Sequence, residues 1–149
     1  MKKIVLLFSV LVLAFTSCEG PMGPPGTPGE GMNWEIINFT VQAQDWRLVG
    51  QPNALGSYYM YEFQANQITN FICEEGNVFG YRWLSNNEQT PLGQVAVMGE
   101  DLGNGQEVLF TEVYSFSFRP GYVTFFIDYS DFATDIRPMT CDFRIVLNY

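Results

Sequence analysis

Hydrophobic and polar residues alternate along most of the chain from Trp34 onward, in runs that are rich in aromatic and β-branched side chains. Gly, Pro, Asn and Asp interrupt these runs at intervals of roughly 8 to 15 residues. An alternation with a period of two places successive side chains on opposite faces of a strand. The pattern therefore predicts an all-β domain over residues 33–149, an antiparallel β-sandwich.

The clearest strand is the last one, over 141–147, where apolar residues at every second position predict one buried face and one mostly polar face. The segment 119–121, Arg-Pro-Gly, separates two alternating runs, 108–118 and 123–129, and predicts a hairpin. Gly103-Asn104-Gly105 predicts a second hairpin, because Asn-Gly accepts the positive φ values of a tight turn.

Two further segments have distinct patterns. Ile68, Phe71 and Ile72 fall at helical spacing, and Gly76 can end a helix, so one short helix is expected over 68–76. A strand over 78–84 follows, and Pro91 then restricts the next strand to the edge of a sheet or to its own start.

The first 17 residues have the features of a bacterial lipoprotein signal peptide. Two lysines precede an apolar run of a dozen residues, which is too short for a permanent transmembrane helix. The run ends in Ala14-Phe15-Thr16-Ser17-Cys18, which resembles a lipobox, although Phe15 stands where Leu is usual. The resemblance implies cleavage before Cys18, lipidation of this cysteine and an effectively permanent membrane anchor.

A linker over 18–32 follows, with three Gly-X-Y triplets starting at Gly20. Such triplets favour extended polyproline II and form a collagen triple helix only when chains trimerise. Three triplets are few, so a stiff monomeric spacer is the simpler interpretation, and a trimeric stalk is the alternative. The leader, the lipobox, these triplets and the closing segment Phe143-Arg144-Ile145-Val146 together resemble Bacteroidetes collagen-like lipoproteins. This resemblance implies an outer-membrane location, on the periplasmic or cell-surface face, and a β-sandwich, but no activity.

Composition narrows the chemistry. Without the leader, five arginines and sixteen acidic residues remain, a net charge of −11, and the arginines are scattered singly, so nucleic acid is not an expected partner. The chain contains no histidine, which removes the common nucleophile–histidine pairs and the usual near-neutral general base. We therefore expect no enzyme and no cofactor, with a carboxylate-dependent glycan-active enzyme as the remote alternative.

Three sets of residues are candidates for sites. Asp128, Asp131 and Asp135 offer oxygen ligands for Ca²⁺, but acidic residues in turns have backbone roles as well, so no metal is expected. Cys73 and Cys141 either form a disulfide in the oxidising envelope or are two separately buried thiols. Four aromatic rings are candidates for a ligand platform, although the core competes for the same rings: Trp34, Trp46, Trp83 and Tyr58.

These observations lead to one main expectation and one alternative. The chain is expected to be a non-catalytic, membrane-anchored envelope lipoprotein whose sandwich binds a glycan or a protein partner. The alternative is a structural or assembly subunit of the envelope, trimeric through its Gly-X-Y segment or associated through sheet edges. The sequence leaves the oligomeric state open.

Overall fold

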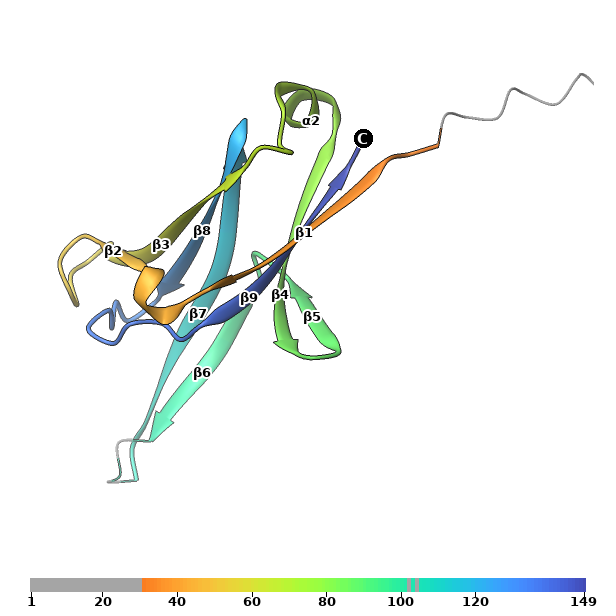
Figure 1. Ribbon diagram of the computed structural model, residues 1–149. Coiled ribbons are helices and arrows are strands. Elements are labelled where there is room, and N and C mark those ends of the chain that lie inside the picture. The colour runs from red at the N-terminus through yellow and green to blue at the C-terminus, as the bar shows by residue number, and fades with distance from the viewer. Residues whose placement is uncertain (1–30, 102, 104) are drawn as a thin grey trace, which may run out of the picture. The chain divides into compact units, whose positions relative to one another are not determined.

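The computed structural model describes residues 31–149 except 102 and 104. The expected signal peptide, Cys18 and the Gly-X-Y triplets lie outside the described residues. Residues Met32–Tyr149 form one unit that consists mainly of antiparallel strands (Figure 1). The all-β prediction is confirmed.

The strands form two sheets that pack face to face. Sheet A has the strand order β1 (Trp34–Val41), β9 (Cys141–Asn148), β4 (Asn77–Ser85), β5 (Glu88–Pro91). Sheet B has the order β2 (Arg47–Val49), β3 (Tyr58–Ala65), β8 (Gly121–Tyr129), β7 (Glu107–Arg119), β6 (Val95–Asp101). All neighbouring strands in both sheets are antiparallel. Both predicted hairpins are present, as β7–β8 and β6–β7, and the strand that contains Pro91 is at the edge of sheet A.

The predicted short helix is α2 (Asn70–Glu75), and a 3₁₀ turn, η1 (Ala43–Asp45), is the other helical element of the described residues. The Ile72 N–H donates to the Thr69 hydroxyl at 3.3 Å, which caps the first turn of α2. At the other end, the Gly76 N–H donates to the Ile72 carbonyl at 3.1 Å. Ile72 is buried, so this short helix is held by its caps and by one core side chain.

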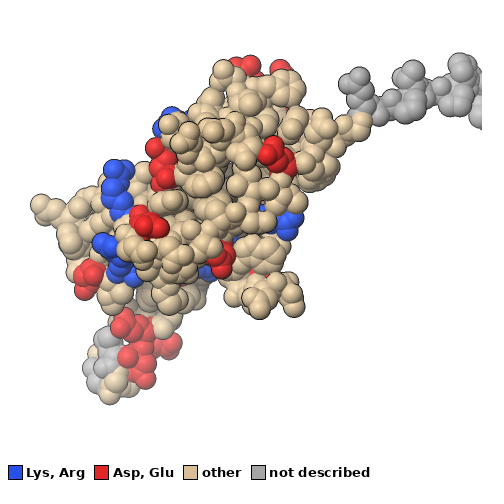
Figure 2. All heavy atoms as spheres, in the orientation of Figure 1, with Lys and Arg blue, Asp and Glu red and all other residues tan. Residues whose placement is uncertain are grey.

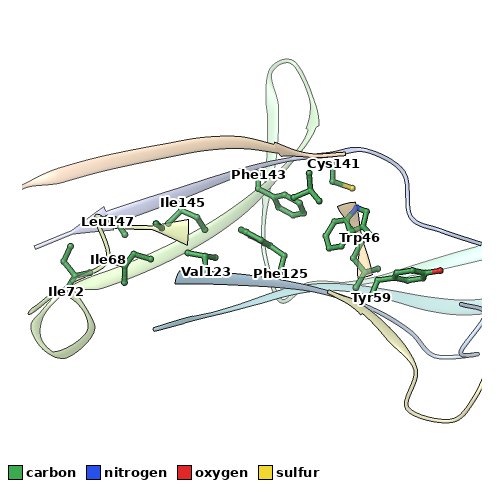
Figure 3. Packing of buried hydrophobic residues seen from close by; sticks show 13 residues of the cluster. Trp46, Tyr59, Ile68, Ile72, Val123, Phe125, Cys141, Phe143, Ile145 and Leu147 are labelled. Atoms are coloured by element: carbon green, nitrogen blue, oxygen red, sulfur yellow. The ribbon is translucent and has the colours of Figure 1, made fainter. Parts of the chain in front are cut away.

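Aromatic rings from both sheets fill the space between them (Figure 3). Phe125 of β8 stacks on Phe143 of β9 with 4.3 Å between ring centroids, and Phe39 of β1 stacks on Phe63 of β3 at 4.5 Å. Each pair joins one strand of sheet A to one strand of sheet B, so the two sheets share a single core.

The last strand differs from its prediction in one respect. On the face of this strand that is turned away from the core, two positions are buried, Val146 and Asn148. Val146 is buried because β9 lies between β1 and β4. Its cross-strand neighbours, Ile36 and Phe79, cover it from both sides.

Both described cysteines are free thiols, so the disulfide alternative does not describe this structure. Cys73 lies just before Asn77, which pairs with Asn148 at the end of β9, whereas Cys141 begins that strand. The intervening length of strand separates the two cysteines by roughly 20 Å. A disulfide requires Cα atoms within about 7 Å, which the antiparallel register prevents.

Candidate functional site

The outer face of sheet A, the face turned away from the core, carries most of the features expected of a binding surface. Alternate positions of three adjacent strands supply it: Trp34, Ile36, Asn38 and Thr40 of β1; Asp142, Arg144, Val146 and Asn148 of β9; Phe79, Tyr81 and Trp83 of β4. The opposite positions of the same strands enter the core. Alternation thus divides each strand into residues that enter the core and residues on the outer face, of which Val146 and Asn148 are themselves buried.

Cross-strand register orders these side chains in rows. Asn38, Arg144 and Tyr81 occupy one row across β1, β9 and β4. The next row towards the chain termini is apolar, with Ile36, Val146 and Phe79. The face therefore presents aromatic and apolar surface beside amide and guanidinium groups, which is a common composition of ligand-binding surfaces.

Three rings on this face are accessible at different levels of the sheet. Trp34 is 63% exposed and Phe79 is 44% exposed, while Trp83 is half-buried. Trp34 pairs with Asn148, whereas Trp83 lies near the start of β9, so the two tryptophans mark opposite ends of the face, roughly 20 Å apart along the strands.

A cleft of about 680 Å³ opens at the Trp83 end of this face. Its rim contains Asn38, Thr40, Trp83 and Asp142. The Thr40 hydroxyl donates to the Asp142 carboxylate, so the two rim strands are joined by a side-chain hydrogen bond. The cleft is thus continuous with the outer face of sheet A.

The floor of the cleft reaches into the core. Arg82 of β4 places its guanidinium 3.7 Å from the centre of the Tyr114 ring, a cation–π contact between the two sheets. The Tyr114 hydroxyl donates to Glu112 at 2.9 Å. Burial raises the pKa of the Tyr114 hydroxyl, with the negative charge of Glu112 acting in the same direction, so this phenol is neutral at physiological pH.

Cys141 also lines the floor, and its environment argues against a nucleophilic role. Burial raises the pKa of its thiol above the usual range, and the nearby Arg82 guanidinium only partly opposes this effect. The reactive form of cysteine is the thiolate, so a raised pKa leaves Cys141 protonated at neutral pH. Its contribution to the cleft is that of a small apolar side chain.

The structure separates the four predicted platform rings. Trp34 and Trp83 lie on the outer face of sheet A, as described. The prediction is wrong for Trp46, which is 1% exposed, packs edge-on against Phe143 and donates its indole N–H to the Met139 carbonyl at 3.2 Å. It follows the 3₁₀ turn η1, where the chain leaves sheet A, so its ring fills the core between the sheets.

Tyr58 lies on sheet B and is remote from the other rings. It is half-buried and tilts against Phe126, with 6.0 Å between ring centroids, on the outer face of β3 and β8. Two rings that the sequence prediction omitted, Phe79 and Tyr81, take its place beside Trp83. The signal was present in the sequence, since residues 79, 81 and 83 share one face of a single strand.

The acidic candidates do not converge. Among the described residues, no three His, Cys, Asp or Glu side chains are grouped so that they could hold a metal ion. Asp131 accepts the Ala133 N–H at 3.1 Å, which is a turn-capping role, while the backbone N–H of Asp135 donates to the Asn53 side chain. Asp128 lies at the end of β8, where burial raises the pKa of its carboxyl.

A second exposed surface lies on the β6–β7 hairpin, which extends beyond the rest of sheet B (Figure 1). Val95, Val97 and Leu109 are exposed there. Figure 2 shows acidic side chains gathered at its tip, where Glu100 and Asp101 end β6 and Glu107 begins β7. Nothing in the structure indicates what covers these apolar side chains.

Comparisons of the chain with family models, with curated proteins and with solved structures give no match. Within the described part of the chain, no helix has the length and apolar character needed to span a bilayer.

Proposed function

We propose that this chain is a non-catalytic envelope lipoprotein whose β domain binds a polysaccharide on the outer face of sheet A. The observation that carries the proposal is the row of rings on β4, with Trp34 at the far corner, beside amide, hydroxyl and carboxylate groups of β1 and β9. Sugar rings have one apolar face and an equatorial belt of hydroxyls, so they fit a surface that combines aromatic rings with hydrogen-bonding side chains.

The dimensions of the face favour a chain-like ligand over a small molecule. The surface runs about 20 Å from Trp83 to Trp34, which is the length of a short oligosaccharide. The cleft at the Trp83 end is open and joins this surface, so a longer chain could continue across it. A pocket for an isolated small ligand would instead bury most of the ligand surface.

The proposed location rests on the leader and the lipobox. A lipidated Cys18 would hold the β domain at a membrane, and the Gly-X-Y triplets would extend about 3.1 Å per residue and separate it from the lipid surface. Replacing Cys18 with Ala should release the chain from the membrane fraction. If C18A remains membrane-bound with an unchanged mass, the lipid anchor is contradicted.

Binding is tested with the whole chain, purified in detergent, against a panel of neutral and acidic polysaccharides by affinity electrophoresis. We expect retardation by at least one polymer. Trp83→Ala and Trp34→Ala should each weaken binding about 10-fold or more, since a stacked ring contributes on the order of 1–3 kcal/mol in comparable aromatic recognition.

Tyr58→Ala is the matched control, because it removes a half-buried ring from the outer face of the other sheet. It should leave retardation unchanged. The proposal fails if no polymer retards the chain, or if Tyr58→Ala weakens binding while both tryptophan variants behave like the parent protein.

A further inference from the structure

Arg144 lies in the middle of the proposed binding surface. It belongs to β9, which is flanked by β1 and β4, and its cross-strand neighbours are Asn38 and Tyr81. Tyr81 in turn pairs with Pro91 of the edge strand. The guanidinium is thus bordered by an amide on one side and by an aromatic ring on the other, with no acidic residue in its own row.

Arg144 also lacks a partner among the residues that the structure describes. All five arginines of the chain lie in its described part, and four of them have a partner there. Arg47 donates to the Met60 sulfur, Arg137 donates to the Gln44 carbonyl, and Arg119 pairs with Glu62 at 3.1 Å. Arg82 stacks on Tyr114. For Arg144, the described residues provide no hydrogen bond, ion pair or ring contact, and its Nε is buried without a hydrogen-bond partner.

The nearest acidic residue on the same face does not neutralise it. Asp142 is two positions earlier on β9 and accepts a hydrogen bond from the Thr40 hydroxyl of β1. No carboxylate oxygen of the described residues lies within ion-pair distance of Arg144. Among the described residues only Arg119 forms an ion pair, so Arg144 is distinguished from the other arginines by having neither a hydrogen bond nor a ring contact.

A guanidinium presents a planar array of N–H donors that matches a carboxylate in a bidentate arrangement. A ligand carboxylate would pair with the two terminal Nη groups of Arg144, whereas Nε is shielded from a ligand as it is from water. The Tyr81 ring beside Arg144 would face the sugar ring that carries this carboxylate.

We infer that Arg144 binds the carboxylate of a uronic acid unit, so that the polysaccharide recognised on the outer face of sheet A is an acidic one. This inference rests on the proposed function and specifies its ligand. The overall negative charge of the chain disfavours anions at long range, so recognition depends on this local contact.

The test compares two polymers that share one backbone, polygalacturonate and its methyl ester, with the whole chain in detergent. We expect the parent protein to bind polygalacturonate at least 10-fold more tightly than the ester. Arg144→Gln should abolish this preference, and Arg144→Lys should retain only part of it because it lacks the bidentate fork. Arg47→Gln, on the other sheet, is the matched control and should retain the full preference.

The outcomes separate the two proposals. If the parent binds the ester as tightly as the acid, or if Arg144→Gln retains the preference, the role of Arg144 is refuted while polysaccharide binding stands. Preference for dextran sulfate over polygalacturonate would refute the carboxylate assignment. If neither these polymers nor neutral ones bind, the proposed function itself fails. A thermal unfolding curve of Arg144→Gln that matches the parent would exclude misfolding as the cause of any loss.

Discussion

Gly80 provides a quantitative test of how closely the two sheets approach. It lies in β4 opposite Ile145, and its missing side chain points into the core. A Cβ built at this position would lie 2.8 Å from Leu92 Cδ1 and 2.8 Å from two carbon atoms of the Phe116 ring. Phe116 belongs to the opposite sheet, so Gly80→Ala would force a ring of sheet B away from the backbone of sheet A.

The expected cost follows from these distances. Ordinary contacts of a Cβ begin at 3.4 Å, so the neighbours would have to move by roughly 0.6 Å. Overpacking of this kind costs about 1–3 kcal/mol, and the lower chain entropy of unfolded Ala offsets about 0.4–1 kcal/mol of it. Gly80→Ala should therefore lower the free energy of unfolding by about 1–2 kcal/mol.

Gly99→Ala is the matched control in an exposed strand. Its Cβ would lie 2.5 Å from Glu107 Oε1, which is closer than any contact at Gly80, yet this atom is the end of an exposed, flexible side chain. We expect a change within about 0.5 kcal/mol. Urea unfolding followed by tryptophan fluorescence measures both variants. The reasoning is refuted if Gly80→Ala unfolds at the parent's urea midpoint, or if Gly99→Ala is the more destabilising of the two.

Three further predictions concern thiols, a buried hydroxyl and alkaline stability. In the native protein a thiol reagent should modify half-buried Cys73 before buried Cys141. Reduction should leave the mass of the protein unchanged, and a mass gain of two hydrogens would contradict the free thiols. Thr134→Val should lower the free energy of unfolding in urea by about 1–3 kcal/mol, because the Thr134 hydroxyl accepts the Asn53 N–H at 3.0 Å and bonds to the buried hydroxyl of Ser57. Parent-like stability would contradict this role. Burial raises the Tyr114 pKa above its unfolded value of 10.0, so the neutral phenol stabilises the fold below that pH and this stability is lost as the pH rises further. The last part of the phenolate absorbance of the eight tyrosines should therefore appear together with the loss of near-ultraviolet circular dichroism, and complete ionisation in a folded protein would refute this.

Local patterns were sufficient to predict several elements of the fold, among them two hairpins and the short helix. The run before and after residues 119–121 defines the β7–β8 hairpin, since a short turn leaves only one antiparallel pairing of two such runs. Thr69 and Gly76 bracket α2 for reasons of capping alone. Pro91 lies in an edge strand because it has no N–H to donate to a further neighbour.

Properties that depend on pairing between distant strands were not predictable. The register of β1 against β9 joins Trp34 to Asn148, and no local pattern specifies it. This register makes Val146 a covered residue and places Cys141 at the opposite end of β9 from the helix that carries Cys73. The same limit applies to Trp46, whose burial depends on the fold of both sheets around it.

The charge of the proposed binding surface also depends on pairing between distant strands. In the sequence, Asp142 and Arg144 are two residues apart on one face of a strand, and the simplest expectation is that they neutralise each other. In the structure Thr40, about a hundred residues earlier in the chain, bonds to Asp142 from the adjacent strand, and the guanidinium of Arg144 has no partner within residues 31–101, 103 and 105–149. A hydroxyl on β1 thus fixes the carboxylate on β9, and the fold leaves a cation available between an amide and an aromatic ring. An arrangement of this kind depends on three strands in register, which is why the candidate site is a property of sheet A as a whole.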